Sequence, residues 1–313
     1  MTAMDLRVRM LGALLRPASS ISKMSRERVL KVQRHGLIHN PVTARIFGAI
    51  APEVTLNDQT IDGPGGALAV RVYRPKKEPS ALVVYFHGGG WTFGTLEHGD
   101  WLCSHVSSAT GAVVVSVDYR LAPLNPFPAA VEDAYAALLW AADEFGAEGR
   151  RLGVMGDSAG GNLAAVASLM ARDRSGPQIS HQALIYPNTD QTLSGSSMRT
   201  NDKKPFLLPA DVVAYRGHYL GDPPTAVRDP YASPLLAEDH SGLPPALIQV
   251  AEHDPIRDDG TRYAEALRAA GVPVRLTEYV GMPHGFMSCP GVCRSAPQAL
   301  AEICAEQLQA LAR

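Results

Sequence analysis

The sequence has few cysteines and no long apolar run, and both absences narrow the classes of protein to which it can belong. Four cysteines in 313 residues are too few for a disulfide scaffold, and their spacing lacks the paired pattern of a zinc site. No run of 18 apolar residues is present, so stable membrane insertion is not expected. We therefore expect a cytoplasmic protein with reduced thiols and no metal, and a bond between Cys289 and Cys293 stays open as an alternative.

An excess of charge of one sign is also lacking. Lys and Arg number 29 against 31 Asp and Glu, which gives a net charge of -2. Without a basic block to attract phosphate backbones, nucleic acid is not an expected partner. At the N-terminus, Arg7, Arg9 and Arg16 interrupt the apolar residues, which predicts a cationic amphipathic helix rather than a signal peptide.

Strand-like segments alternate with helical patterns through most of the chain. Segments 81–86 and 112–117 are apolar throughout, which is typical of parallel strands covered on both faces by helices. A hairpin around the glycines of 62–66 is expected to join strands 54–61 and 67–73. The remaining strands are expected at 151–155, 182–186, 246–250 and 274–279, and the helices at 101–110, 129–145, 162–172, 258–270 and 296–311. This alternation predicts an α/β fold with a mostly parallel, eight-stranded sheet.

Two stretches depart from this alternation. Residues 1–50 have helical patterns, and residues 188–233 are polar, then helical over 209–220, then rich in proline. We expect these two stretches to pack together as a helical cap over an active site. Residues 51–187 and 234–313 would then form the catalytic domain.

A serine between glycines stands where a strand is expected to give way to a helix. The segment Gly156-Asp157-Ser158-Ala159-Gly160 follows the strand at 151–155 and precedes the helix at 162–172, as in a nucleophile elbow. Side chains two places before or after the serine would collide with neighbouring backbone, so the chemistry requires glycine there. Ser158 is therefore the candidate nucleophile, and Asp157 is expected to brace the turn.

Three consecutive glycines follow the strand at 81–86. In His87-Gly88-Gly89-Gly90-Trp91 they let backbone N–H groups face a substrate oxygen without side-chain obstruction. Fixed N–H donors stabilise the negative charge that develops on that oxygen during ester hydrolysis. We expect the oxyanion hole to consist of Gly89 and Gly90, with Gly88 nearby, and of the amide of Ala159.

A serine nucleophile needs a histidine base and a carboxylate that orients it. Of the ten histidines, His284 follows a late strand and lies in a turn-like segment. Asp254 follows the strand at 246–250, which is where such a carboxylate must lie. The resulting chain order of Ser158, Asp254 and His284 is that of the α/β-hydrolase fold.

These motifs together resemble the hormone-sensitive-lipase-like carboxylesterases, in the Gly-Asp-Ser-Ala-Gly subgroup of the α/β-hydrolase superfamily. The resemblance extends over roughly residues 54–284. It rests on the motifs already described and on Val117-Asp118-Tyr119-Arg120-Leu121-Ala122-Pro123, Phe127-Pro128-Ala129-Ala130-Val131-Glu132-Asp133-Ala134, Asp254-Pro255-Ile256-Arg257-Asp258 and His284-Gly285-Phe286.

The resemblance implies a helical cap and hydrolysis of short- to medium-chain acyl esters without a cofactor. It also implies that Ser158, His284 and Asp254 are the triad and that a small-molecule ester is the partner. Members of the family often form homodimers, and the edge strand expected at 274–279 is the surface that would pair.

Several points stay open at this stage. Trp91, Phe93, Phe206, Leu207 and Tyr215 are candidates to line the substrate pocket, with packing in the core or cap as the alternative. The triad would equally serve an amidase or a thioesterase. A non-catalytic receptor on the same scaffold is a further alternative, which the presence of His284 disfavours.

Overall fold

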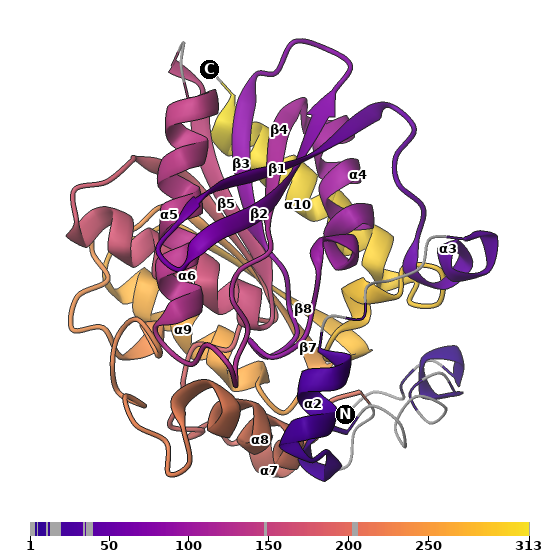
Figure 1. The fold of residues 1–313 in the computed structure, drawn as a ribbon, viewed down its shortest axis with the longest axis vertical. Helices are drawn as coiled ribbons and strands as arrows, with labels where there is room; N and C mark the ends of the chain where they lie inside the picture. The colour runs from indigo at the N-terminus through magenta and orange to yellow at the C-terminus, as the bar shows by residue number, and fades with distance from the viewer. Residues whose placement is uncertain are drawn as a thin grey trace.

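A computed structural model shows one mixed sheet with helices on both faces (Figure 1). The structure describes residues 4, 6–10, 12, 20–33, 35, 40–146, 149–201 and 206–312. Over these residues the sheet has eight strands in the order β1-β2-β4-β3-β5-β6-β7-β8. The strands are β1 (Val54–Gly63), β2 (Gly66–Pro75), β3 (Ala81–Phe86), β4 (Ala112–Val117), β5 (Arg151–Asp157), β6 (Ile179–Ile185), β7 (Ala246–His253) and β8 (Val274–Pro283).

The strand directions are those expected from the sequence. β1 and β2 form the expected antiparallel hairpin, which turns between Gly63 and Gly66. β2 also pairs antiparallel with β4, and the remaining five pairings are parallel. The prediction of a mostly parallel, eight-stranded sheet is therefore confirmed.

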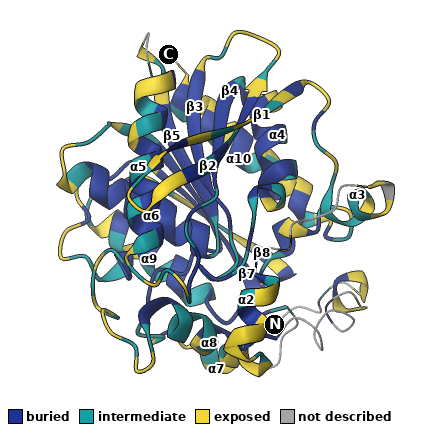
Figure 2. Cartoon of the chain, in the orientation of Figure 1, coloured by how far each residue is buried: buried dark blue, intermediate teal, exposed yellow. Residues whose placement is uncertain are grey.

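Alternate residues of the central strands supply two separate hydrophobic cores. In β3, Leu82, Val84 and Phe86 join the core on one face of the sheet. Val83 and Tyr85 join the core on the other face. Because side chains alternate across a strand, a strand buried on both faces is apolar at every position. Figure 2 shows the central strands in the dark blue of buried residues.

Helices cover each core. α5 (Ala129–Phe145), α6 (Ala159–Asp173) and α9 (Arg257–Ala269) pack on the first core. α4 (Asp100–Thr110) and α10 (Ser295–Leu311) pack on the second. The short helices are η2 (Leu96–Gly99), η4 (Pro234–Leu236) and η5 (Phe286–Ser288). The bounds of α5 are those predicted from the sequence, and the other four long helices begin within three residues of their predicted starts.

The segments expected to form a cap meet at one point that the structure describes. The N-terminal region contains η1 (Ile21–Lys23), α2 (Arg26–Val32) and α3 (Pro41–Phe47), and the 188–233 region contains α7 (Ser197–Thr200) and α8 (Pro209–Leu220). The Ser20 hydroxyl donates a 2.7 Å hydrogen bond to Oδ1 of Asp211, which also accepts from the Ser22 N–H. This carboxylate therefore fixes η1 to the start of α8, while the division into cap and catalytic domain stays a prediction.

Some N-terminal expectations fall partly outside the described residues. Residues 6–10 are helical, as the amphipathic pattern predicts, but Arg16 lies outside the described part. The helical pattern expected in residues 1–50 is also seen in α2, which ends at Val32. A search of the described chain finds no helix with the length and apolarity to cross a bilayer. The four cysteines are all described and buried, and none forms a disulfide.

Candidate active site

Ser158 occupies a sharp turn between β5 and α6. Its φ of 54° and ψ of -116° are rare for a residue with a side chain, and strain of this kind gathers at functional sites. The turn is possible because its neighbours are glycines. A Cβ on Gly156 would overlap the carbonyl of Gly160, and a Cβ on Gly160 would overlap the carbonyl of Phe86. The glycines thus let β5, α6 and β3 approach closely enough to hold the serine at the tip.

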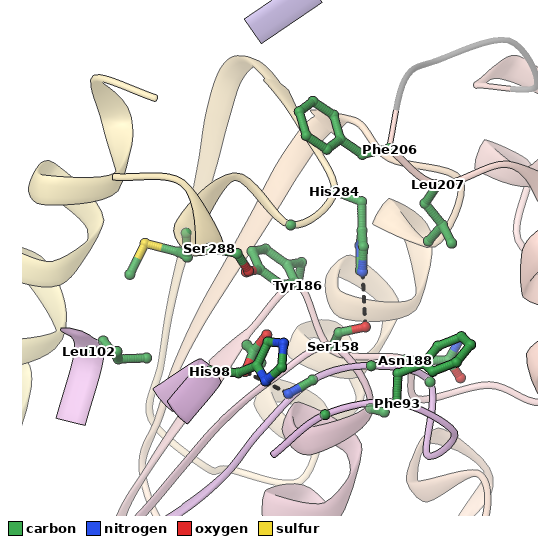
Figure 3. Close-up of a pocket in the computed structure, with 18 of the residues that line it drawn as sticks. Phe93, His98, Leu102, Ser158, Tyr186, Asn188, Phe206, Leu207, His284 and Ser288 are labelled. Atoms are coloured by element: carbon green, nitrogen blue, oxygen red, sulfur yellow. Dashed lines mark hydrogen bonds between the residues drawn. The ribbon is translucent and has the colours of Figure 1, made fainter. Parts of the chain in front are cut away.

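Three side chains from distant parts of the sequence lie in a hydrogen-bonded row. Nε2 of His284 is 2.9 Å from Oγ of Ser158 (Figure 3), and Nδ1 of His284 is 2.7 Å from Oδ2 of Asp254. Asp254 is completely buried and His284 nearly so. The residues follow β5, β7 and β8, whose carboxyl ends share one edge of the sheet. The arrangement can take a proton from the serine hydroxyl and hold the resulting imidazolium beside a carboxylate.

The loop that carries Asp254 is tied to the segment after β6. The Ile256 N–H donates to Oδ1 of Asp254 at 2.9 Å, which fixes the carboxylate. Nδ2 of Asn201 donates to the backbone carbonyls of Glu252 and Asp254 at 3.2 and 2.9 Å. Asp254 is therefore held both by its own loop and by a side chain from the 188–233 region.

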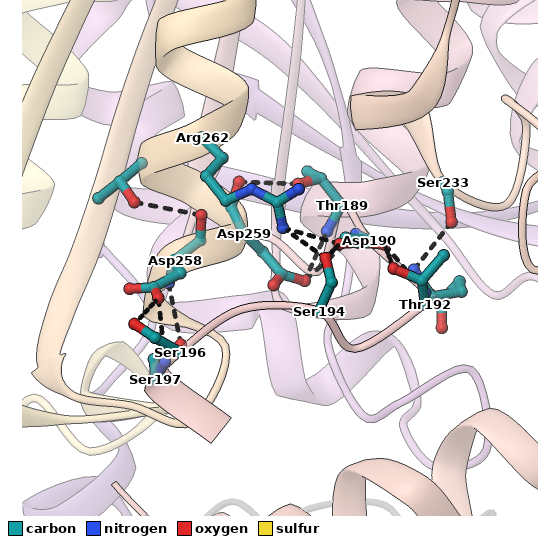
Figure 4. A network of polar contacts seen from close by, with 12 residues as sticks. Thr189, Asp190, Thr192, Ser194, Ser196, Ser197, Ser233, Asp258, Asp259 and Arg262 are labelled. Carbon is teal, nitrogen blue, oxygen red and sulfur yellow. Dashed lines mark hydrogen bonds and ion pairs between the residues drawn. The ribbon is translucent and has the colours of Figure 1, made fainter. Parts of the chain in front are cut away.

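A polar network holds the same two segments together further along α9 (Figure 4). Oδ2 of Asp259 accepts from the N–H groups of Thr189 and Asp190, each at 3.2 Å. Arg262 donates to Oδ2 of Asp190 at 2.8 Å. Burial and, less strongly, the charge of Asp190 raise the pKa of the Asp259 carboxyl well above its ordinary value. The network anchors the chain just after the Asn188 that faces the cavity.

The glycine loop after β3 supplies unpaired backbone donors. Among the described residues, no hydrogen-bond acceptor contacts the N–H groups of Gly89, Gly90 or Ala159. Ala159 is the first residue of α6, and helix-initial N–H groups have no partner within the helix. Gly89 has a φ of 117°, and a Cβ there would overlap the carbonyl of Phe93. These three amides are thus available to a ligand oxygen.

The expected donor set needs one correction. The N–H of Gly88 donates to Oδ1 of Asp157 at 2.9 Å, so it is not available to a substrate. The Tyr85 hydroxyl donates to the same oxygen at 2.6 Å. Burial raises the pKa of the Asp157 carboxyl above its ordinary value, which these hydrogen bonds oppose. Asp157 therefore braces the glycine loop as well as the elbow, and Gly88 supports the loop without facing its ligand.

A cavity of about 470 Å³ surrounds Ser158 and His284. Its walls are mostly apolar, and the polar side chains beside the reacting residues include Glu97, His98, Asn188 and Gln191. The wall residues that sequence reasoning singled out are Trp91, Phe93, Phe206, Leu207 and Tyr215. Tyr215 packs edge-on against Phe93, with ring centroids 6.1 Å apart. The Trp91 ring stacks on Tyr219 at 4.2 Å within the core, so for Trp91 packing is its main role.

Other wall residues were not foreseen from the sequence. They come from α3, α4, the ends of β6 and β8, and the start of α9. Examples are Phe47, Leu102, Tyr186, Asn188, Ile256, Met287 and Ser288. Tyr186 follows β6 with a φ of 35°, and its ring lies 4.8 Å from that of His284. The only sequence signal for Tyr186 and Asn188 is their place after a parallel strand, which they share with ordinary loop residues.

A metal site was not expected, and the described residues contain no cluster of three or more His, Cys, Asp or Glu that could hold a metal ion. Ser158 and His284, which line the cavity, instead form a hydrogen-bonded row with Asp254.

Comparison with known proteins places the chain among hydrolases. A family model described as the alpha/beta hydrolase fold matches residues 83–288. The carboxylic ester hydrolase LipN of Mycobacterium tuberculosis is 47% identical over 244 residues, which are 75% of this chain and 65% of LipN, just under two thirds of its length. Esterase LipI of the same organism is 42% identical over 262 residues, with 80% of each chain covered.

Solved structures agree along almost the whole chain. A hyperthermophilic esterase from the archaeon Pyrobaculum calidifontis superposes with a TM-score of 0.84 and is 38% identical in sequence. The match covers 98% of this chain and 99% of that one. The similarity therefore includes the segments before and after the region that the family model matches.

Proposed function

The chain belongs to the hormone-sensitive-lipase-like branch of the α/β-hydrolase family and is a carboxylesterase, and we propose that it cleaves short- to medium-chain acyl esters through an acyl-enzyme on Ser158. The observation that carries the proposal is the unbroken row from Ser158 through His284 to Asp254.

In the first half of the reaction, Nε2 of His284 takes the proton from Oγ of Ser158 as this oxygen attacks the ester carbonyl. The N–H groups of Gly89, Gly90 and Ala159 would receive the negative charge that forms on the carbonyl oxygen. Loss of one such donor typically costs about 2.7–4 kcal/mol of transition-state stabilisation. His284 then gives its proton to the departing alcohol.

In the second half, His284 deprotonates a water molecule, which attacks the acyl group on Ser158. His284 then returns this proton to Oγ of Ser158 as the acyl–oxygen bond breaks, which restores the serine and releases the carboxylic acid. Asp254 keeps Nδ1 of His284 protonated, so that Nε2 faces the reacting oxygen in both halves. The fully buried position of Asp254 strengthens this interaction, because the local dielectric constant is low.

The size of the cavity supports the proposed substrate class. About 470 Å³ lies within the range of pockets that bind small organic ligands. Phe93, Leu207 and Tyr215 are the walls against which a short acyl or alcohol chain would pack.

The test is hydrolysis of p-nitrophenyl esters from acetate to palmitate by the wild type and by Ser158→Ala. We expect the Ser158→Ala variant to lose turnover of the butyrate ester, and the wild type to be fastest at four to eight carbons. Wild-type rates in the variant would remove the serine from the mechanism. A maximum at palmitate would leave the serine in place but overturn the chain-length proposal.

Two further properties stay predictions from the sequence, namely a cytoplasmic location and a homodimer. β8 is an edge strand of the sheet, as the dimer prediction requires. Light scattering after size-exclusion chromatography measures the mass of the particle directly. A mass of one chain at all concentrations would contradict the dimer.

A further inference from the structure

Positive charge is concentrated in the first 50 residues of the chain. This stretch has nine Lys and Arg against two Asp and Glu, a formal charge of +7. Because the whole chain has a charge of -2, the other 263 residues have a charge of -9. The near-neutral total thus conceals two parts of opposite sign. The proposed reaction uses none of these N-terminal charges.

The described basic side chains of this stretch face solvent. They are Arg7, Arg9, Lys23, Arg26, Arg28, Lys31 and Arg45, and Glu27 is the exposed acid among them. Within the described residues, no ion pair is formed by Lys23, by Arg45 or by the three basic residues of α2. The positive electrostatic field of these five side chains is therefore not neutralised by a neighbouring carboxylate among the described residues.

Exposed apolar side chains lie among these charges. Leu6 and Met10 are 66% and 65% exposed, and Val42 on α3 is 67% exposed. Residues 6–10 are helical, so Leu6 and Met10 lie one turn apart on one face, while Val8 between them is fully buried. Large apolar side chains exposed beside basic ones are typical of helices that lie in a membrane interface.

This basic and apolar surface adjoins the substrate cavity. α3 exposes Val42 and Arg45 to solvent, while Thr43, Phe47 and Gly48 line the cavity. Figure 1 shows these N-terminal segments on the right-hand side of the molecule, with α3 above and α2 below, and Figure 2 shows much of their surface as exposed. A molecule resting on this surface would bring the cavity close to whatever it rests on.

We infer that the N-terminal surface docks this protein reversibly on an anionic lipid bilayer. The seven exposed basic side chains described above, against Glu27 alone, are complementary to anionic headgroups, and each Lys or Arg near such a surface contributes about 1 kcal/mol. The charge of -9 on the remainder orients the molecule with its N-terminal surface toward the lipid. The exposed Leu6, Met10 and Val42 favour a bilayer over nucleic acid, because apolar side chains can be buried among lipid chains but not against a phosphate backbone.

Docking of this kind is peripheral and requires no spanning helix. The inference rests on the proposed function only for the purpose of docking, which is to bring membrane-dissolved esters to the cavity. The binding itself depends only on surface side chains. The two ideas can therefore fail separately.

The experiment measures sedimentation of the full chain with vesicles of phosphatidylcholine, alone or with phosphatidylglycerol at about a third of the lipid. We expect binding to the anionic vesicles only, and loss of it near 1 M salt, where the screening length falls to about 3 Å. Arg26→Gln, Arg28→Gln and Lys31→Gln in combination should weaken binding about 100-fold. Leu6→Ser with Met10→Ser should weaken it too.

The matched control removes three exposed basic residues from elsewhere, through Lys76→Gln, Lys77→Gln and Arg268→Gln. It should bind as the wild type does, and so should Ser158→Ala, whose loss of hydrolysis tests the proposed function instead. No wild-type binding to anionic vesicles would overturn the inference. Equal loss of binding in the triple variant of α2 and in the control variant would also overturn it. Binding to a DNA duplex in preference to the vesicles would do the same.

Discussion

The backbone N–H of Gly88 donates a 2.9 Å hydrogen bond to Oδ1 of Asp157, the residue just before the candidate nucleophile. This contact joins the glycine loop after β3 to the elbow after β5. Because the Tyr85 hydroxyl donates to the same oxygen, one carboxylate fixes three segments of the site. The positions of the Gly89 and Gly90 amides relative to Ser158 therefore depend on a side chain that does not itself react.

Replacement of Asp157 should show this dependence. Asp157→Ala leaves two buried donors without an acceptor and lets the glycine loop shift, and misplacement of about 1 Å can cost about 100-fold in rate. We expect kcat to fall by 10- to 100-fold in p-nitrophenyl butyrate hydrolysis. Asp157→Asn keeps an oxygen acceptor and should retain most of the rate. Equal losses in both variants would point to the charge instead of the hydrogen bonds.

Asp254→Asn should preserve the fold and lose most of the activity. An amide can donate to Nδ1 of His284, which would leave Nε2 protonated and unable to accept the serine proton. We expect kcat to fall by about 10⁴, the loss seen for this change in serine proteases, with little effect on KM. Steady-state kinetics measure both constants, and circular dichroism checks the fold. Activity within tenfold of the wild type would exclude the orienting role.

Gly160→Ala should destabilise the protein strongly, because the new Cβ would overlap the carbonyl of Phe86. We expect a loss of more than about 3 kcal/mol in the free energy of unfolding. The matched control is Gly217→Ala in α8, where nothing lies within 4 Å of the new Cβ. There we expect a gain of up to about 1 kcal/mol. Urea denaturation compares the two, and similar shifts would contradict the steric argument.

Stability should fall in mild acid because of His181 on β6. Burial lowers the pKa of its imidazole to about 4, and neither ring nitrogen has a hydrogen-bond partner among the described residues. The unfolded chain, with a pKa near 6.5, takes up the proton first, so stability decreases as the pH falls from about 6.5 to about 4. The contribution of this group between pH 7 and pH 5 is about 2 kcal/mol.

His181→Leu should therefore flatten the pH dependence of the free energy of unfolding over that interval. The control is His35→Gln, which changes an exposed histidine and should leave the wild-type slope in place. Denaturation curves at several pH values measure the slopes. An unchanged slope in His181→Leu would show that other groups control the loss.

Much of the fold could be predicted from the sequence because its signals are local. The continuous apolar runs at 81–86 and 112–117 are strands covered on both faces, and the helix over 129–145 has its predicted bounds. The row of Ser158, Asp254 and His284 was also proposed from motif order, and the structure brings the three side chains into contact. Their catalytic roles stay a proposal until the variants are measured.

The parts that sequence reasoning missed depend on contacts between distant segments. Gly88 stands in the same motif as Gly89, and only the position of Asp157 shows that its N–H is already bonded. Likewise, nothing in the sequence around Leu102 or Met287 indicates a cavity wall, because an apolar residue next to empty space and one next to packed atoms look alike. The sequence pattern indicated a cationic helix only at the start of the chain, and the whole-chain charge of -2 conceals the +7 of the first 50 residues.

Seven of the residues lining the cavity come from the single stretch between β6 and β7, namely Tyr186, Asn188, Gln191, Phe206, Leu207, Val212 and Tyr215. The reacting groups come from the strand ends on either side of it. One insertion thus supplies much of the wall that an ester would contact, and through Asn201 it also holds the loop of Asp254. Directed evolution confined to this insertion should retune which esters are accepted, provided that Asn201 is kept.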